Sequence, residues 1–149
     1  MARVQLALNV SDLDQAVAFY SKLFHATPAK LRPGYANFAI DEPPLKLVLI
    51  ENPGRGGSLN HLGVEVEDTV AVDAVRRRLE TEGLGATEER GVTCCYAMQD
   101  KFWVQETPDA ERWEVYTVLA DSATASAVSA EAPGCCGETD EQVTACCAS

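Results

Sequence analysis

The chain has 149 residues, of which 46% are hydrophobic, and it carries a formal net charge of -11 with an isoelectric point near 4.5. This length suits one compact domain with a substantial core. The negative charge repels phosphate backbones and anionic lipids, so nucleic acids and membranes are excluded as expected partners and small molecules remain. No apolar run approaches the roughly 18 residues of a membrane span, and the first residues lack a secretory h-region, so we expect a cytosolic location.

An internal repeat organises the folded part of the chain. Segments 4–12 and 60–68 resemble each other at an offset of 56 residues. In both segments apolar residues alternate with other residues, which is typical of a half-buried strand. Asp12 and Asp68 follow these strands and precede apolar residues at helical spacing, so each predicts the N-cap of a helix.

Further strands are predicted after each helix. They fall at residues 35–40, 45–51, 92–98 and 112–119, with Pro43-Pro44 as the turn between the first two. Each copy of the repeat is therefore interpreted as a β-α-β-β-β module. We expect an α+β fold in which two curved sheets enclose a cleft.

The predicted boundaries follow from the same patterns. Module one spans about residues 2–52, module two about 59–119, and together they form a domain at 1–119. From Ala120 onward the chain has no aromatic and no basic residue. Residues 120–149 are therefore interpreted as a flexible tail.

All six cysteines stand in adjacent pairs, at Cys94-Cys95, Cys135-Cys136 and Cys146-Cys147. Neighbouring thiols can hold one soft atom together, while the short backbone between them disfavours a disulfide. A reducing cytosol would keep them as thiols. A single cysteine is ordinarily an inert core residue, but three pairs predict binding of a thiophilic centre such as arsenic or cadmium.

The pair in the folded part meets a geometric difficulty. Successive residues of a strand point to opposite faces, so the sulfurs of Cys94 and Cys95 can converge only at a bulge or at a strand end. Gly91, shortly before the pair, permits such a distortion.

Three polar residues suggest a metal site. Gln5 and His61 occupy equivalent positions in the repeat, and Glu114 stands between Trp113 and Val115 in the last predicted strand. Each alone has an ordinary structural interpretation, but a carboxylate among apolar neighbours is costly to bury unpaired. Together the three residues predict metal binding.

The duplicated module, with Gln5 and His61 equivalent and the run Pro108-Asp109-Ala110-Glu111-Arg112-Trp113-Glu114, resembles the vicinal oxygen chelate superfamily. This superfamily includes glyoxalases, extradiol dioxygenases and bleomycin-resistance proteins. With Cys94-Cys95 added, residues 2–119 are similar to the carbon-arsenic lyases and the related cadmium-inducible proteins.

The resemblance implies a function. Gln5, His61 and Glu114 would bind a mononuclear non-haem Fe(II), with O2 as co-substrate. Cys94 and Cys95 would hold a trivalent organoarsenical while its carbon-arsenic bond is cleaved to release arsenite, for detoxification. The sequence leaves open whether methyl- or phenylarsenicals are preferred, and whether the modules pair within one chain or across a homodimer.

The same residues have other interpretations. A glyoxalase I needs a fourth protein ligand, a carboxylate from module one, and the run 45–49 contains no acid. A non-enzymatic arsenic- or cadmium-binding protein would need the thiol pairs but not the Gln5, His61 and Glu114 set. Phe102, Trp103 and Trp113 are predicted core residues, with a mobile lid over residues 100–107 as the alternative. His25 is predicted to be a cap or surface residue.

Overall fold

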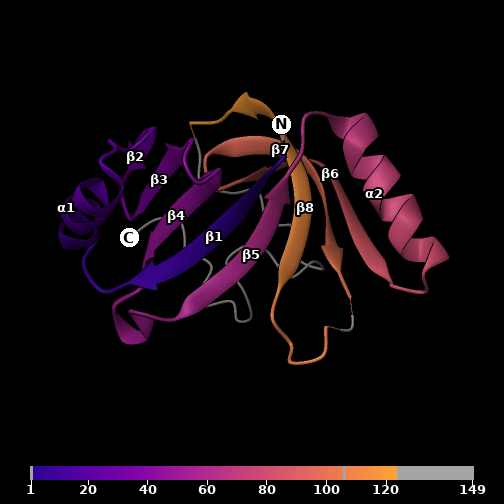
Figure 1. The fold of residues 1–149 in the computed structure, drawn as a ribbon, viewed down its shortest axis with the longest axis horizontal. Coiled ribbons are helices and arrows are strands. Elements are labelled where there is room, and N and C mark those ends of the chain that lie inside the picture. Colours follow the sequence, from indigo (N-terminus) through magenta and orange to yellow (C-terminus); the bar gives the residue numbers. More distant parts are fainter. Residues whose placement is uncertain (1, 106, 124–149) are drawn as a thin grey trace. The chain divides into compact units, whose positions relative to one another are not determined.

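A computed structural model describes residues 2–105 and 107–123 (Figure 1). Most of the predicted tail, including Cys135-Cys136 and Cys146-Cys147, lies outside the described residues. The first module comprises β1 (Arg3–Val10), α1 (Leu13–Phe24), β2 (Lys30–Arg32), β3 (Tyr35–Ile40) and β4 (Leu45–Glu51). A short 3-10 helix, η1 (Pro53–Arg55), leads to the second module, which comprises β5 (Leu59–Glu65), α2 (Thr69–Thr81), β6 (Ala86–Cys94), β7 (Ala97–Val104) and β8 (Trp113–Asp121).

The α+β fold and the duplicated βαβββ order are confirmed. Two strand predictions need correction. The strand predicted over residues 92–98 is divided between β6 and β7 by a turn at Cys95-Tyr96, and the short strand β2 was not predicted. The turn was missed because it contains no glycine, asparagine or proline, the residues that usually mark a two-residue turn.

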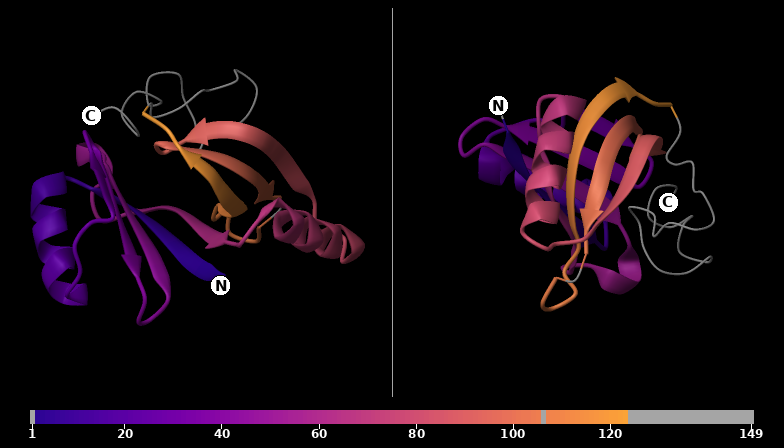
Figure 2. Two further views of the ribbon diagram at one scale, coloured as in Figure 1. Left: turned by 90° about the horizontal axis from the view of Figure 1, so that it is seen from above. Right: turned by 90° about the vertical axis from the view of Figure 1, so that its right-hand side faces the viewer.

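The described residues divide into two compact units. The first unit contains residues 5–60, and the second unit contains residues 2–4 and 61–123. In each unit the helix lies along one side of its own strands (Figure 2). No helix in the described part of the chain has the length and apolar character needed to cross a membrane.

The first unit is built around the apolar face of α1. β2, β3 and β4 pair antiparallel, and β1 lies beside β4. Leu13 of α1 packs against fully buried Phe38 and Leu49 of the sheet. Burial of side chains of this size stabilises the fold by about 1.5–3 kcal/mol each. His25 ends α1 in the left-handed conformation, with φ of 50°, which confirms its predicted role as a cap.

The second unit has the strand order β5-β8-β7-β6, with β5 and β8 parallel and the other pairs antiparallel. Val72 of α2, Phe102 of β7 and Val115 of β8 form the core between helix and sheet. Alternation along the strands therefore sends one set of side chains to α2 and the other set to the opposite face. That opposite face carries the residues of the candidate site.

Asp100 holds a β-bulge in place within the second unit. The pairing of β6 with β7 shifts between Glu89 and Val92, where Gly91 adopts a φ of 57°. Asp100 accepts hydrogen bonds from the Gly91 N–H at 2.8 Å and from the Thr69 hydroxyl at 2.7 Å. Burial opposes ionisation, but these donors and a nearby arginine hold the pKa of Asp100 below its ordinary value. A distortion is thus present at Gly91, but the strand pairing is regular again from Val92 to Cys94, so this bulge is not what brings the two sulfurs together.

Both predicted N-caps are confirmed. The Asp12 carboxylate accepts from the Gln15 N–H, and the Asp68 carboxylate accepts from the Ala71 N–H, each at 2.8 Å. Such bonds satisfy backbone donors that have no partner within the helix.

We predict that Asp12→Ala and Asp68→Ala each lower the free energy of unfolding by about 1 kcal/mol, because each removes one capping acceptor. Asp14→Ala, in the first turn of α1 but not at its cap, serves as the control and should cost only about 0.3 kcal/mol. Urea unfolding followed by circular dichroism measures all three. An Asp68→Ala variant as stable as the parent would show that the cap does not stabilise α2.

Candidate functional site

One face of the second unit's sheet is lined with buried polar side chains. Alternation along β7 places Gln99, Lys101 and Trp103 on this face, and pairing with β8 sets Trp103 opposite Glu114. The other face of β7 contributes Phe102 to the α2 core. We call the side away from α2 the polar face. Its position follows from the period of two in a strand.

His61 and Glu114 meet on the polar face. β5 runs parallel to β8 with Gly63 opposite Glu114, so His61, two residues before Gly63, lies on the same side. The His61 Nε2 is 3.3 Å from the Glu114 Oε1, and the side chains are only 1% and 3% exposed. The structure thus brings two of the three predicted metal ligands together.

Lys101 is the partner of Glu114 that was not predicted from the sequence. Its Nζ donates to the Glu114 Oε2 at 3.1 Å and lies 3.6 Å from the Glu89 carboxylate. Burial alone would raise the pKa of Glu114, but the Lys101 charge and the hydrogen bonds from His61 and Lys101 hold it well below its ordinary value. Glu114 is therefore an ionised carboxylate in a buried setting.

The His61 and Glu114 pair fits a divalent metal. Two donor atoms each about 2.1 Å from one ion, at right angles, would lie about 3.0 Å apart, close to the observed 3.3 Å. Lys101 supplies one positive charge beside two carboxylates, so a cation would offset the remaining negative charge. In residues 2–105 and 107–123, no three His, Cys, Asp or Glu side chains gather as a metal site.

Gln5 lies in β1 within the first unit and is 4% exposed. Its neighbours Leu6 and Leu8 pack into the α1 core, so alternation directs Gln5 to the side of the sheet away from α1. Gln5 and His61 each occupy the third position of their strands, which confirms their equivalence in the repeat. The meeting of Gln5 with His61 and Glu114 across the two units stays a prediction.

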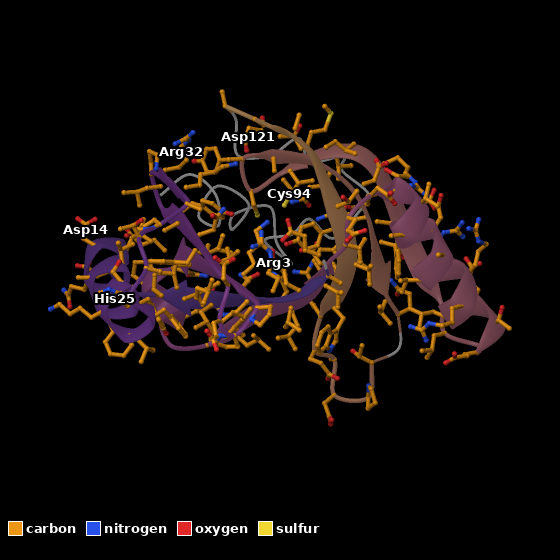
Figure 3. The ribbon with its side chains drawn as sticks, turned by 45° about the horizontal axis from the view of Figure 1, so that its top comes forward. Arg3, Asp14, His25, Arg32, Cys94 and Asp121 are labelled. Carbon is orange, nitrogen blue, oxygen red and sulfur yellow. The ribbon has the colours of Figure 1, made fainter. Side chains whose placement is uncertain are left out.

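The vicinal thiols lie at a strand end, as their convergence requires. Cys94 ends β6, Ala97 begins β7, and the two residues pair (Cys94 is labelled in Figure 3). Between them, Cys95 and Tyr96 have φ angles of 53° and 60°, the pattern of a tight type I′ turn. We call residues 94–97 the thiol hairpin. The sulfurs of Cys94 and Cys95 are 3.2 Å apart, and Cys94 is disulfide-bonded in this structure.

The thiol hairpin suits a shared soft atom. Two sulfurs at this separation can each lie about 2.3 Å from one centre, a typical metal-thiolate distance, with an angle of about 90° there. Positive φ costs an ordinary residue about 1–2 kcal/mol, and Cys95 and Tyr96 both adopt it. These φ angles make the turn itself unfavourable. What the turn achieves is to bring the Cys95 sulfur close to the Cys94 sulfur.

The end of β8 supports this turn. β8 continues to Asp121, two residues past the predicted end of the domain at Leu119, and Asp121 pairs with Ala97. The Ser122 N–H donates to the Tyr96 carbonyl oxygen at 2.9 Å. Asp121 and Ser122, which lie just beyond the predicted boundary, thus contact the thiol hairpin through strand pairing and a backbone hydrogen bond.

Trp103 forms an aromatic wall beside His61. The two rings meet edge to face with centroids 5.7 Å apart, and the Arg112 guanidinium lies 4.4 Å from the Trp103 ring centre. Burial of Phe102 and Trp103 confirms them as core residues. Residues 100–104 belong to β7, paired on both sides, so the alternative of a lid beginning at residue 100 is wrong.

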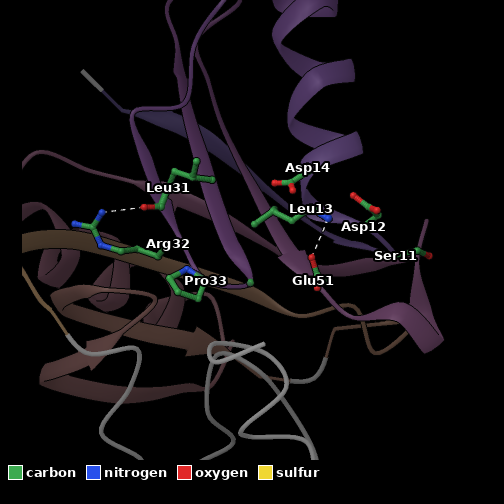
Figure 4. Close-up of a pocket in the computed structure, with 9 residues that line it drawn as sticks. Ser11, Asp12, Leu13, Asp14, Leu31, Arg32, Pro33 and Glu51 are labelled. Atoms are coloured by element: carbon green, nitrogen blue, oxygen red, sulfur yellow. Dashed lines mark hydrogen bonds between the residues drawn. The ribbon is translucent and has the colours of Figure 1, made fainter.

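A separate pocket of about 620 Å³ opens beside the start of α1 in the first unit (Figure 4). None of the predicted site residues lines it. The Glu51 carboxylate accepts from the Leu13 N–H at 2.9 Å there, and Asp12 caps the same helix. The acidic side chains of this pocket thus have a structural role in starting α1.

A model of the Glyoxalase/Bleomycin resistance protein/Dioxygenase superfamily matches residues 3–115. The chain belongs to this superfamily. The resemblance inferred from the repeat and the Trp113-Glu114 strand is thereby confirmed.

Relatives within the superfamily cover most of the chain. It is 65% identical over 124 residues to the cadmium-induced protein CadI of Mycobacterium tuberculosis, covering 83% of this chain and 81% of that protein. It is 55% identical over 141 residues to the trivalent organoarsenical cleaving enzyme of Thermomonospora curvata, covering 94% of this chain and 91% of that enzyme. An extradiol ring-cleaving dioxygenase from B. fuscum shares the fold with a TM-score of 0.56 at 17% identity, over 80% of this chain and 33% of that one.

We predict that Lys101→Met lowers the free energy of unfolding of this superfamily member by about 3–5 kcal/mol, because it leaves the Glu114 carboxylate buried without its cation. The double variant Lys101→Met/Glu114→Gln should recover most of that loss, since the fully buried carboxylate is then neutral and only the partly exposed Glu89 has lost its cation. Urea unfolding of metal-free protein measures both. Lys22→Met, on the exposed surface of α1, is the control and should change stability by less than about 0.5 kcal/mol. Equal stability of Lys101→Met and the parent would contradict the buried ion pair.

Proposed function

We propose that this protein cleaves the carbon-arsenic bond of trivalent organoarsenicals, with Fe(II) as cofactor and O2 as co-substrate. The observation that carries the proposal is the thiol hairpin, whose two sulfurs stand 3.2 Å apart in the same unit as the His61 and Glu114 pair. The 55% identity to an enzyme named for cleaving trivalent organoarsenicals supports it.

Substrate capture is the task of the thiols. A trivalent organoarsenical R–As(OH)₂ exchanges both hydroxyls for the sulfurs of Cys94 and Cys95 and releases two waters, so the arsenic keeps its carbon group and gains two fixed bonds. This removes most of the rotational freedom of the bound substrate. A reducing cytosol, which we propose as the location, would reduce the Cys94 disulfide and keep both cysteines in the thiol form that this exchange needs.

Gln5, His61 and Glu114 would hold the iron. The Glu114 carboxylate supplies an anionic oxygen and His61 a neutral nitrogen, a mixed donor set that suits Fe(II). Bound Fe(II) supplies the activation of dioxygen. For a methylarsenical, one O2 would be consumed, and one As–OH group and one formaldehyde would form, which balances all atoms and electrons.

The surrounding side chains prepare the site for this chemistry. Lys101 keeps Glu114 ionised and fixes its second oxygen by a hydrogen bond. Trp103 packs edge-on against the His61 ring and restricts its orientation. Both side chains are almost completely buried, so water is largely excluded from this part of the polar face.

We predict that His61→Ala and Glu114→Ala lose tight iron binding, because each substitution removes one of the proposed ligands of Fe(II). Gln5→Ala should retain weaker binding, since a neutral amide oxygen is a poorer ligand than the other two. Iron is measured by mass spectrometry after anaerobic reconstitution with Fe(II) and desalting.

His25→Ala is the matched control for the histidine, because His25 is exposed at the end of α1 and should leave the iron content unchanged. Tight, stoichiometric iron in either His61→Ala or Glu114→Ala would overturn the ligand assignment.

We predict that Cys94→Ser and Cys95→Ser each abolish arsenite release while iron content stays at the parent level. A single thiolate gives a labile adduct in which the carbon-arsenic bond is not oriented. The assay loads the protein with Fe(II) anaerobically, adds trivalent methyl- or phenylarsenical, admits air and measures arsenite by chromatography and mass spectrometry. Cys146→Ser is the matched control and should retain turnover at saturating substrate. Full activity of Cys95→Ser would make the pair incidental.

The second candidate function is binding without cleavage, for resistance to arsenic or cadmium. The 65% identity to a protein named for its induction by cadmium supports this second candidate. The same assay separates the two functions, because a binding protein retains the organoarsenical intact in air whether or not Fe(II) is present.

A further inference from the structure

Gln99 is a buried polar residue with an unused acceptor. Its side chain is 5% exposed, and its Oε1 has no hydrogen-bond partner among the described residues. Leaving such an acceptor unpaired is unfavourable, so buried acceptors of this kind usually serve a ligand or another specific purpose. The iron ligands and thiols proposed above do not require it.

The strand pairing places Gln99 next to the thiol hairpin. Cys94 pairs with Ala97, and Gln99 lies two residues further along β7, so Cys94 and Gln99 are diagonal neighbours on one face. The pairing of Val92 with Gln99 continues without a shift to Cys94. Diagonal neighbours are about 7–8 Å apart at Cα, within reach of a long side chain.

The chemistry of arsenic indicates what this acceptor would receive. An organoarsenical bound by two thiolates has exchanged both of its hydroxyls and keeps no O–H donor on arsenic. Inorganic arsenite has three hydroxyls, so after As(OH)₃ reacts with two thiols and releases two waters, one As–OH remains. That hydroxyl is a hydrogen-bond donor, and its arsenic is bound to the sulfurs of Cys94 and Cys95 in the thiol hairpin.

We propose that Cys94 and Cys95, once reduced to thiols, form with Gln99 a binding site for inorganic arsenite, in which the remaining As–OH donates a hydrogen bond to the Gln99 Oε1. The inference rests on the proposed function in that both use the thiol hairpin for arsenic. Gln99 then distinguishes the inorganic product from the organic substrate and holds the product after cleavage.

The test compares two ligands on one protein. The full-length chain carrying Cys135→Ser, Cys136→Ser, Cys146→Ser and Cys147→Ser, with Gln99 or with Gln99→Met, is dialysed anaerobically without metal against sodium arsenite or methylarsenous acid. Arsenic on each side is measured by mass spectrometry. Methionine has a length close to that of glutamine but no oxygen acceptor. Gln105→Met, an exposed glutamine of the same unit, is the matched control.

Gln99→Met should weaken arsenite binding by about 3- to 30-fold, the range for loss of one buried hydrogen bond, and change methylarsenous acid binding by less than about 2-fold. Gln105→Met should change neither. Equal weakening of both ligands would make Gln99 a structural residue and overturn the inference, as would unchanged arsenite binding. Failure of the Gln99 protein to bind methylarsenous acid would overturn the proposed function itself, together with this inference.

Discussion

The candidate site depends on how a buried carboxylate is kept ionised. Glu114 is almost completely removed from water, which would make it neutral without compensation. Lys101 and His61 supply that compensation, one at each oxygen, and both are themselves buried. A carboxylate held in this way has a fixed orientation and a fixed charge, which are the properties a metal ligand needs.

The same sheet serves two purposes because its faces are separated by strand alternation. Phe102 packs beneath α2, whereas Lys101 and Trp103, its neighbours in sequence, lie on the polar face. The helix side supplies hydrophobic stabilisation. The polar face can then carry unfavourable features, such as the Gln99 acceptor, which has no partner among residues 2–105 and 107–123, and the positive φ angles of the thiol hairpin.

The sequence predicted features that depend on local patterns or on repetition. The caps at Asp12 and Asp68 could be predicted because each aspartate directly precedes apolar residues at helical spacing. The equivalence of Gln5 and His61 could be predicted from the repeat. Lys101 as the partner of Glu114 could not be predicted, because their contact depends on how β7 pairs with β8. The turn at Cys95-Tyr96 could not be predicted either, since hydrophobic residues run through it without a break and its positive φ angles fall on residues that rarely adopt them.

The side of the sheet on which each β7 residue falls has a consequence for how this protein can change during evolution. Asp100 anchors β7 by its bonds to Thr69 and Gly91, with core and site residues alternating on either side. Insertion or deletion of a single codon in β7 before Lys101 would move Lys101 and Phe102 each to the opposite face of the sheet, placing an ammonium group beneath α2 and a phenyl ring on the side of Glu114. Length changes should therefore be confined to loops, while β7 varies only by substitution.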